Sequence, residues 1–153
     1  MSRPPERNAF DRLRIVRRLA RPIEAAQVRW FGASLVSVAA RTPVLVLHTT
    51  GRRSGAERST PVAFHLDDDG SFLIVGGAGG QARVPDWVAN VRASDDADVA
   101  VTVDRRRVAV RVEELVGDER RRTWARLTSV WPRIDVYEHR AGRPVPVLRL
   151  TPR

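Results

Sequence analysis

The sequence has no cysteine, no lysine, few aromatic residues and no long apolar run. Without cysteine, the chain has no disulfide framework, no thiolate metal site and no cysteine nucleophile, which suits a reducing compartment. No apolar stretch approaches the roughly 18 residues that a membrane-spanning helix needs, and residues 1–24 hold no apolar core of an export signal. We therefore expect a cytoplasmic protein, and 153 residues suit one domain with its own core.

The absence of lysine means that all 27 basic residues are arginine, and the formal net charge is +9. A pI of about 11.5 points to an anionic partner, such as nucleic acid, phospholipid, an acidic protein or a polyanionic small molecule. A coding bias toward arginine is a second explanation of the excess. The aromatic residues do not alternate with the arginines as a stacking platform requires, so we expect no nucleic-acid partner.

The N-terminal region is polar and then helical in pattern. Residues 1–8 suit a disordered arm, and residues 9–153 a single domain that includes the N-terminal helices. Residues 10–23 repeat apolar side chains at helical spacing with arginines on the other faces, and a second helical pattern covers 23–40. The basic helix either packs on the core with its arginine-bearing face in solvent, or it contacts an anionic membrane. The second alternative would place the protein peripherally at the inner face of that membrane.

Beyond residue 42 the period changes to that of strands. Short apolar or alternating runs predict strands over residues 43–49, 59–66, 71–77, 97–103, 108–115 and 145–150. A short helix is predicted near Pro85, and a longer one from an Asp118 N-cap to about Trp131. Six strands, mostly joined as hairpins, favour a mainly β (α+β) fold, a small antiparallel barrel with helices packed outside. Both Gly-rich loops, 49–55 and 76–80, leave strand ends and are expected to meet at the rim.

The first of these loops, TTGRRSGAERSTPV, combines glycine with arginine. Gly51 and Gly55 let the backbone approach a ligand, while Arg52, Arg53 and Arg58 offer forked donors for phosphate or carboxylate. The loop lacks the order and the lysine of a P-loop. It is either an anion cradle or an arginine-rich hairpin turn.

The second loop, residues 76–80, has little side-chain bulk, so it leaves room for a planar ring, although a plain flexible loop is the alternative. The three histidines show no metal-ligand spacing, and no serine has the context of a hydrolase triad, so we expect no metal site. A bound organic cofactor would then carry any chemistry.

Together with the segment IVGGAGGQARVPDWVANVRASDDADVAVTV, the first loop resembles the deazaflavin-dependent nitroreductase family. The pattern T-T-G-R-[RK]-S-G-x-x-R-x-x-P, then G-G and P-x-W-x-x-N, covers about residues 43–150. The resemblance implies a split β-barrel related to the FMN-binding pyridoxamine oxidase-like proteins. It also implies coenzyme F(420), a deazaflavin with a phosphate and an oligoglutamate tail, with FMN as the alternative cofactor.

The family pattern implies particular cofactor contacts. The phosphate and the tail are assigned to Thr50, Gly51, Arg52, Arg53, Ser54, Gly55 and Arg58. The ring is assigned to Pro61, Val62 and Ala63 and to the loop formed by Gly76, Gly77, Ala78, Gly79 and Gly80. Trp87 and Asn90 are expected to buttress that loop, and Arg83 to replace a lysine that relatives often carry where this chain has Ala78.

The resemblance further implies transfer of hydride from reduced F(420) to an electron-poor acceptor, which is a quinone, an activated alkene or a nitroaromatic compound. Tyr137 is the expected proton donor or substrate hydrogen-bond partner, with Trp131 and Ile134 as pocket walls, although all three also suit ordinary packing. Several relatives have tyrosine at the positions of Trp131, Ile134 and Ala63. The alternative function is a non-catalytic barrel that binds or stores deazaflavin, FMN, haem or lipid, and the chain is expected to be a monomer or homodimer.

Overall fold

The computed structural model describes residues 42–95 and 98–153. Their elements are β1 (Val44–Thr50), β2 (Glu57–Leu66), β3 (Phe72–Val75), η1 (Ala78–Gly80), α3 (Asp86–Ala93), β4 (Ala100–Val103), β5 (Arg106–Glu114), α4 (Gly117–Val130), α5 (Ile134–Ala141) and β6 (Val147–Pro152). The arm predicted over 1–8, the helices predicted over 10–23 and 23–40, and the membrane contact assigned to 10–23 lie outside the described residues.

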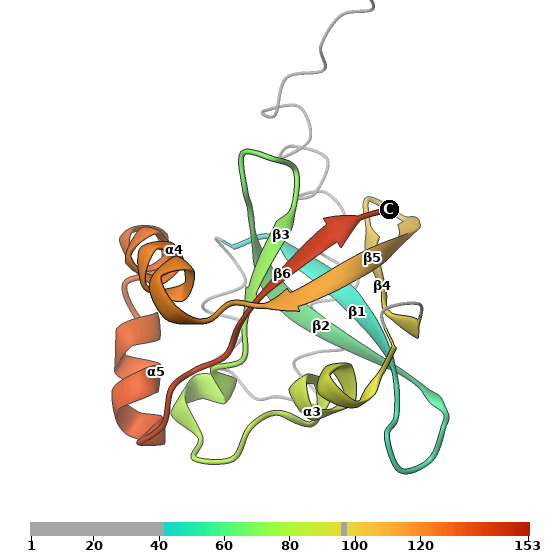
Figure 1. The fold of residues 1–153 in the computed structure, drawn as a ribbon, viewed down its shortest axis with the longest axis horizontal. Helices are drawn as coiled ribbons and strands as arrows, with labels where there is room; N and C mark the ends of the chain where they lie inside the picture. Colours follow the sequence, from blue (N-terminus) through green and yellow to red (C-terminus); the bar gives the residue numbers. More distant parts are fainter. Residues whose placement is uncertain (1–41, 96–97) are drawn as a thin grey trace, which may run out of the picture.

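The strands close into an antiparallel barrel in the order β1-β2-β3-β6-β5-β4 (Figure 1). β1 lies between β2 and β4, so Leu47 has Thr60 beside it on one strand and Val101 on the other. Closure pairs the backbone groups along both edges of every strand of the barrel, which is how small β folds avoid open edges. The predicted mainly β fold with outer helices is confirmed, and each of the six predicted strands is present.

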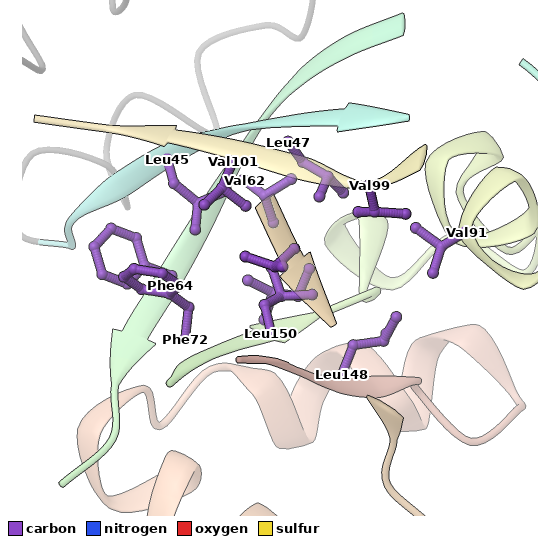
Figure 2. Close-up of a cluster of buried hydrophobic side chains, with 12 residues drawn as sticks. Leu45, Leu47, Val62, Phe64, Phe72, Val91, Val99, Val101, Leu148 and Leu150 are labelled. Carbon is purple, nitrogen blue, oxygen red and sulfur yellow. The ribbon is translucent and has the colours of Figure 1, made fainter. Parts of the chain in front are cut away.

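The barrel interior is filled by alternate residues of the strands. In β1, for example, Leu45 and Leu47 are 1% and 0% exposed. Figure 2 shows Phe64 and Phe72 at one end of this cluster, where their rings meet edge to face with centroids 5.3 Å apart. At the other end Val91 of α3 reaches into the same cluster (Figure 2). α3 therefore closes one end of the barrel.

A second apolar cluster joins the outside of the barrel to α4 and α5. Its buried members are Leu73, Leu115, Leu127, Ile134 and Val147. Figure 1 shows α4 and α5 together on one side of the barrel. This side is thus covered by helices, and the apolar outward face of β3 and β6 is buried beneath them.

The C-terminal helices differ from the prediction in two respects. α4 has Val116 at its N-cap and begins at Gly117, so the predicted N-cap at Asp118 is wrong. Asp118 instead lies in the first turn, where a negative charge interacts favourably with the helix dipole. In addition, α5, a helix of 8 residues that follows Pro132, was not predicted.

Both Gly-rich loops lie at the end of the barrel that α3 closes (Figure 1). The β1–β2 connection is bonded to α3 through Arg52 and Asn90, and Gly76 approaches Val88 of the same helix. The two loops thus share one end of the barrel, as predicted, and α3 lies between them.

Candidate functional site

The connection from β1 to β2 is a tight loop whose backbone requires glycine. We call residues 51–58 the arginine loop. The amide of Gly51 donates to the carbonyl of Ala56, and the amide of Gly55 to the carbonyl of Gly51, both at 2.8 Å. Gly55 has φ +67°, and a Cβ at Gly51 would lie 2.8 Å from Ser54 Oγ. A side chain at Gly55 would be strained by the backbone, and one at Gly51 would be crowded by Ser54, so both glycines favour this loop shape.

Arg52 uses its hydrogen-bond donors in contacts within the protein. Its Nη1 donates to Asn90 Oδ1 at 2.9 Å, and its backbone amide donates to the same oxygen at 3.3 Å. Its Nη2 lies 3.1 Å from Asp86 Oδ1, and its side chain is 26% exposed. Arg52 therefore fastens the arginine loop to α3.

Arg53 and Arg58 differ from Arg52 because both lack an acidic partner among the described residues. Arg58 Nη2 donates weakly to Ser54 Oγ at 3.4 Å, and both arginines are exposed. A guanidinium offers a planar fork of donors that matches phosphate and carboxylate. This donor chemistry fits the phosphate and carboxylate groups of the cofactor that the sequence led us to expect.

Asp86, the first residue of α3, is the acidic residue of this site. Its Oδ1 lies 2.6 Å from Arg83 Nη2 as well as close to Arg52. The hydrogen bond from Arg52, followed by the charge of Arg83, lowers the pKa of Asp86 below its usual range. The carboxylate is therefore ionised at neutral pH.

The glycine loop, residues 76–80, packs against α5. A Cβ at Gly77 would lie 3.1 Å from Tyr137 Cδ2, and one at Gly80 would lie 2.8 Å from Arg140 Cβ. Gly80 also has φ +89°. The glycine content predicts space for a planar ring, but at Gly77 and Gly80 this space is occupied by α5. Gly79, with nothing within 4 Å of a Cβ, is open.

Sequence reasoning missed Arg143, which shapes the segment after the glycine loop. Its guanidinium donates to the carbonyl oxygens of Gln81, Ala82 and Arg83 at 3.0, 2.8 and 3.1 Å. Three carbonyls thus converge on one side chain, which holds Arg83 close to α3. Nothing in the local sequence distinguishes Arg143 from the other arginines, so this contact could not be predicted.

His48 is the histidine with the most contacts in the described part of the chain. Its Nδ1 is 2.9 Å from Ser59 Oγ, its Nε2 is 2.7 Å from Thr102 Oγ1, and its side chain is 12% exposed. Burial, and then the charge of Arg107, lower the pKa of His48. Residues 42–95 and 98–153 contain no group of three or more metal-ligating side chains, and none of their helices is long and apolar enough to span a membrane.

Comparison with known proteins gives the family. A sequence profile described as F(420)H(2)-dependent quinone reductase matches residues 20–152. The chain belongs to this family. An F(420)H(2)-dependent quinone reductase of Mycobacterium tuberculosis is 33% identical over 112 residues, covering 72% of this chain and 74% of the relative.

Two further proteins agree with this assignment. A putative F(420)H(2)-dependent quinone reductase of the same organism is 32% identical over 111 residues, covering 72% of this chain and 91% of the relative. A solved structure of an F(420)-H(2) dependent reductase superposes with a TM-score of 0.61 at 28% identity, over 71% of this chain and 93% of that one. The resemblance drawn from the sequence is confirmed.

Among the residues that the resemblance to the deazaflavin-dependent nitroreductase family implies, those of β2 lie on two different faces of the strand. Val62 is 8% exposed and belongs to the barrel core, whereas its neighbours Pro61 and Ala63 face the other side of the strand. The side chain of Val62 therefore points into the barrel, away from the side of the strand that Pro61 and Ala63 face. Thr50, at the end of β1, is partly buried beside the arginine loop.

Asn90 and Trp87 are predicted to support the glycine loop, but the contacts that they make in the structure are with other parts of the protein. Asn90 is 6% exposed and bonds to Arg52 of the arginine loop, while Trp87 packs against the core cluster of the barrel. Val88, which is not among the expected site residues, is the α3 residue beside Gly76. α3 therefore contacts both loops through different residues.

Tyr137, Trp131 and Ile134 lie together at the helical side of the barrel. Ile134 is 5% exposed within the second apolar cluster, against which Trp131 and Tyr137 also pack. The Tyr137 ring lies against Gly77, and its phenol oxygen has no hydrogen-bond partner in the described part of the chain. The structure thus brings Tyr137 to the glycine loop, while the pocket roles of Trp131 and Ile134 stay predictions.

Proposed function

We propose that this protein is an oxidoreductase that uses reduced coenzyme F(420) to reduce a quinone. Membership in the F(420)H(2)-dependent quinone reductase family is the observation that carries this conclusion. The arginine loop supports it, because the exposed Arg53 and Arg58 suit the phosphate and carboxylates of the cofactor. The deazaflavin supplies a hydride when it is bound.

The chain's own residues then have distinct tasks. Arg53 and Arg58 bind the anionic part of the cofactor, and Arg52 holds the loop that carries them against α3. The open edge at Gly79 is the part of the glycine loop that admits the ring. α5 and the barrel limit the access of water, which favours hydride transfer over side reactions.

Tyr137 is the residue assigned to the acceptor. Its position against Gly77 suits a hydrogen bond to a quinone oxygen, to which the phenol can also donate a proton, since no residue of 42–95 or 98–153 accepts or donates a hydrogen bond at this oxygen. A quinone is the acceptor named for the relatives. An activated alkene or a nitroaromatic compound would use the same hydride donor and remains the predicted alternative.

Two further predictions concern the location of the protein and its oligomeric state. Contact of residues 10–23 with an anionic membrane would bring the protein near quinones, and this contact stays a prediction, as does the choice between monomer and homodimer.

A barrel that binds a cofactor without turnover is the alternative function. It would bind F(420) tightly and show no turnover with any acceptor.

A binding titration tests the proposal. Wild-type protein is titrated with F(420) and with FMN at low and moderate salt, beside Arg53→Ala, Arg58→Ala and the control Arg122→Ala, which removes an exposed arginine of α4. We expect preference for F(420), affinity that falls with salt, and weaker binding in the two loop variants alone. Preference for FMN, or equal binding by all variants, would contradict the proposal.

A further inference from the structure

Asp86 joins two arginines that come from different loops. Its Oδ1 lies 3.1 Å from Arg52 Nη2 and 2.6 Å from Arg83 Nη2. The Asp86 side chain is 61% exposed. The Asp86 carboxylate is therefore exposed to an incoming anion. It already accepts hydrogen bonds from guanidinium groups that lie at the arginine loop.

The two arginines depend on Asp86 to different degrees. Arg52 is 26% exposed and is also held by Asn90 Oδ1 and by the carbonyl oxygen of Asp86, so it keeps its place without the carboxylate. Arg83 is 71% exposed, and within residues 42–95 and 98–153 its side chain bonds to Asp86 alone. The segment that bears Arg83 is held separately, by Arg143. Asp86 therefore determines chiefly whether the Arg83 guanidinium is free.

We propose that Asp86 is an internal competitor for the anionic ligand and so determines which anions the site binds. The inference rests on the proposed function, since it concerns the same cofactor site. In the absence of ligand the Asp86 carboxylate occupies Arg83, and an anion that extends from the arginine loop to Arg83 must displace it. The negative charge of Asp86 also opposes such an anion directly. A short anion that contacts Arg53 and Arg58 alone is affected less.

Competition and simple structural support predict opposite results for Asp86→Asn. The asparagine oxygen still accepts a hydrogen bond from Arg52, but the charge that holds Arg83 is gone. If Asp86 competes with the ligand, this variant binds polyanions more tightly. If Asp86 only supports the loop, the variant binds them more weakly or equally.

The test uses tripolyphosphate and F(420) as probes, with calorimetric titration of the full chain at low salt. We expect Asp86→Asn to bind both about two- to fivefold more tightly than wild type, the range that an exposed ion pair allows. Asp68→Asn is the control, because it makes the same change in net charge in the turn after β2. The gain should shrink in the Arg83→Ala background, since Arg83 is then no longer there to be freed.

Several results would overturn the inference. They are weaker or unchanged binding of tripolyphosphate by Asp86→Asn, an equal gain in Asp68→Asn, an equal gain in the Arg83→Ala background, or no binding of tripolyphosphate by any variant. Failure of the proposed function looks different. In that case tripolyphosphate follows the expected pattern while no variant binds F(420).

Discussion

Arg120 connects α4 to α5 and to the segment before β6, and its replacement by methionine should loosen the helix that carries Tyr137. Its Nη2 donates to the carbonyl oxygen of Val145 at 2.8 Å and to the two carboxylate oxygens of Glu138 at 3.1 and 3.3 Å. The guanidinium carbon also lies 5.0 Å from the ring centroid of Trp124. Methionine keeps the aliphatic stem and removes these contacts.

The size of the effect follows from burial. Val145 is 0% exposed, so its carbonyl loses a charge-assisted hydrogen bond, which costs about 1 to 3 kcal/mol. The pair with Glu138 is 21% and 30% exposed and contributes about 0.5 to 1 kcal/mol, and the contact with Trp124 about 0.5 kcal/mol. We expect a loss of roughly 3 kcal/mol in the free energy of unfolding. In a chain of this length that corresponds to a fall in Tm of about 6 to 12 °C.

Thermal and chemical unfolding of Arg120→Met and of Arg121→Met measure this loss. The neighbouring Arg121 is 74% exposed, so its variant is the matched control and should unfold within about 0.5 kcal/mol of wild type. Hydrogen exchange should also rise in α5. An Arg120→Met protein as stable as the control would refute the reasoning that this arginine holds the two helices together.

Three further predictions follow. Gly80→Ala should destabilise the protein by about 1 to 3 kcal/mol in chemical unfolding, because φ is +89° and Arg140 Cβ lies 2.8 Å from the new methyl group; unchanged stability would contradict this. The lowered pKa of His48 means that its contribution to stability is present above about pH 6.5 and is lost as the pH falls through the lower folded pKa. Tm should therefore fall less on acidification in His48→Gln, and an equal fall would refute this assignment. Arg143→Ala should speed hydrogen exchange at residues 81–83 with little change in β1, whereas unaltered exchange would show that the three carbonyl contacts are dispensable.

The strands could be predicted because each has a recognisable pattern in the local sequence. In β1 the apolar residues run continuously, in β4 and β5 valines alternate, and turn residues separate the pairs. Closure of the barrel followed from the number of short hairpin-connected strands. α5 was not predicted, although Gly142 ends it in the left-handed conformation typical of a helix C-terminus. Its 8 residues are too few for a clear helical period and its N-cap has no side-chain hydrogen bond, so its stability depends on burying Ile134 against the barrel.

The location of the two Gly-rich loops at one end of the barrel could be predicted, but not the contacts that each arginine makes. Arg52 and Arg53 are adjacent and chemically identical in the sequence, yet one is bonded to Asn90 and Asp86 and the other is free of acidic partners in the described part of the chain. The partner of Arg52 lies on α3, far along the chain, and its identity depends on how that helix closes the barrel. For the same reason the sequence cannot show that Gly77 and Gly80 are needed for the close approach of α5.

Oxidation of reduced F(420) by a quinone is the measurement that tests the central claim most directly. Reduced cofactor, the full-length protein and a soluble quinone are mixed without oxygen, and the return of the absorbance of the oxidised deazaflavin is followed beside reactions that lack protein or quinone. The account predicts many turnovers for each protein molecule when all three are present. Oxidation no faster than without protein, with F(420) bound and a broad set of quinones tried, would contradict it.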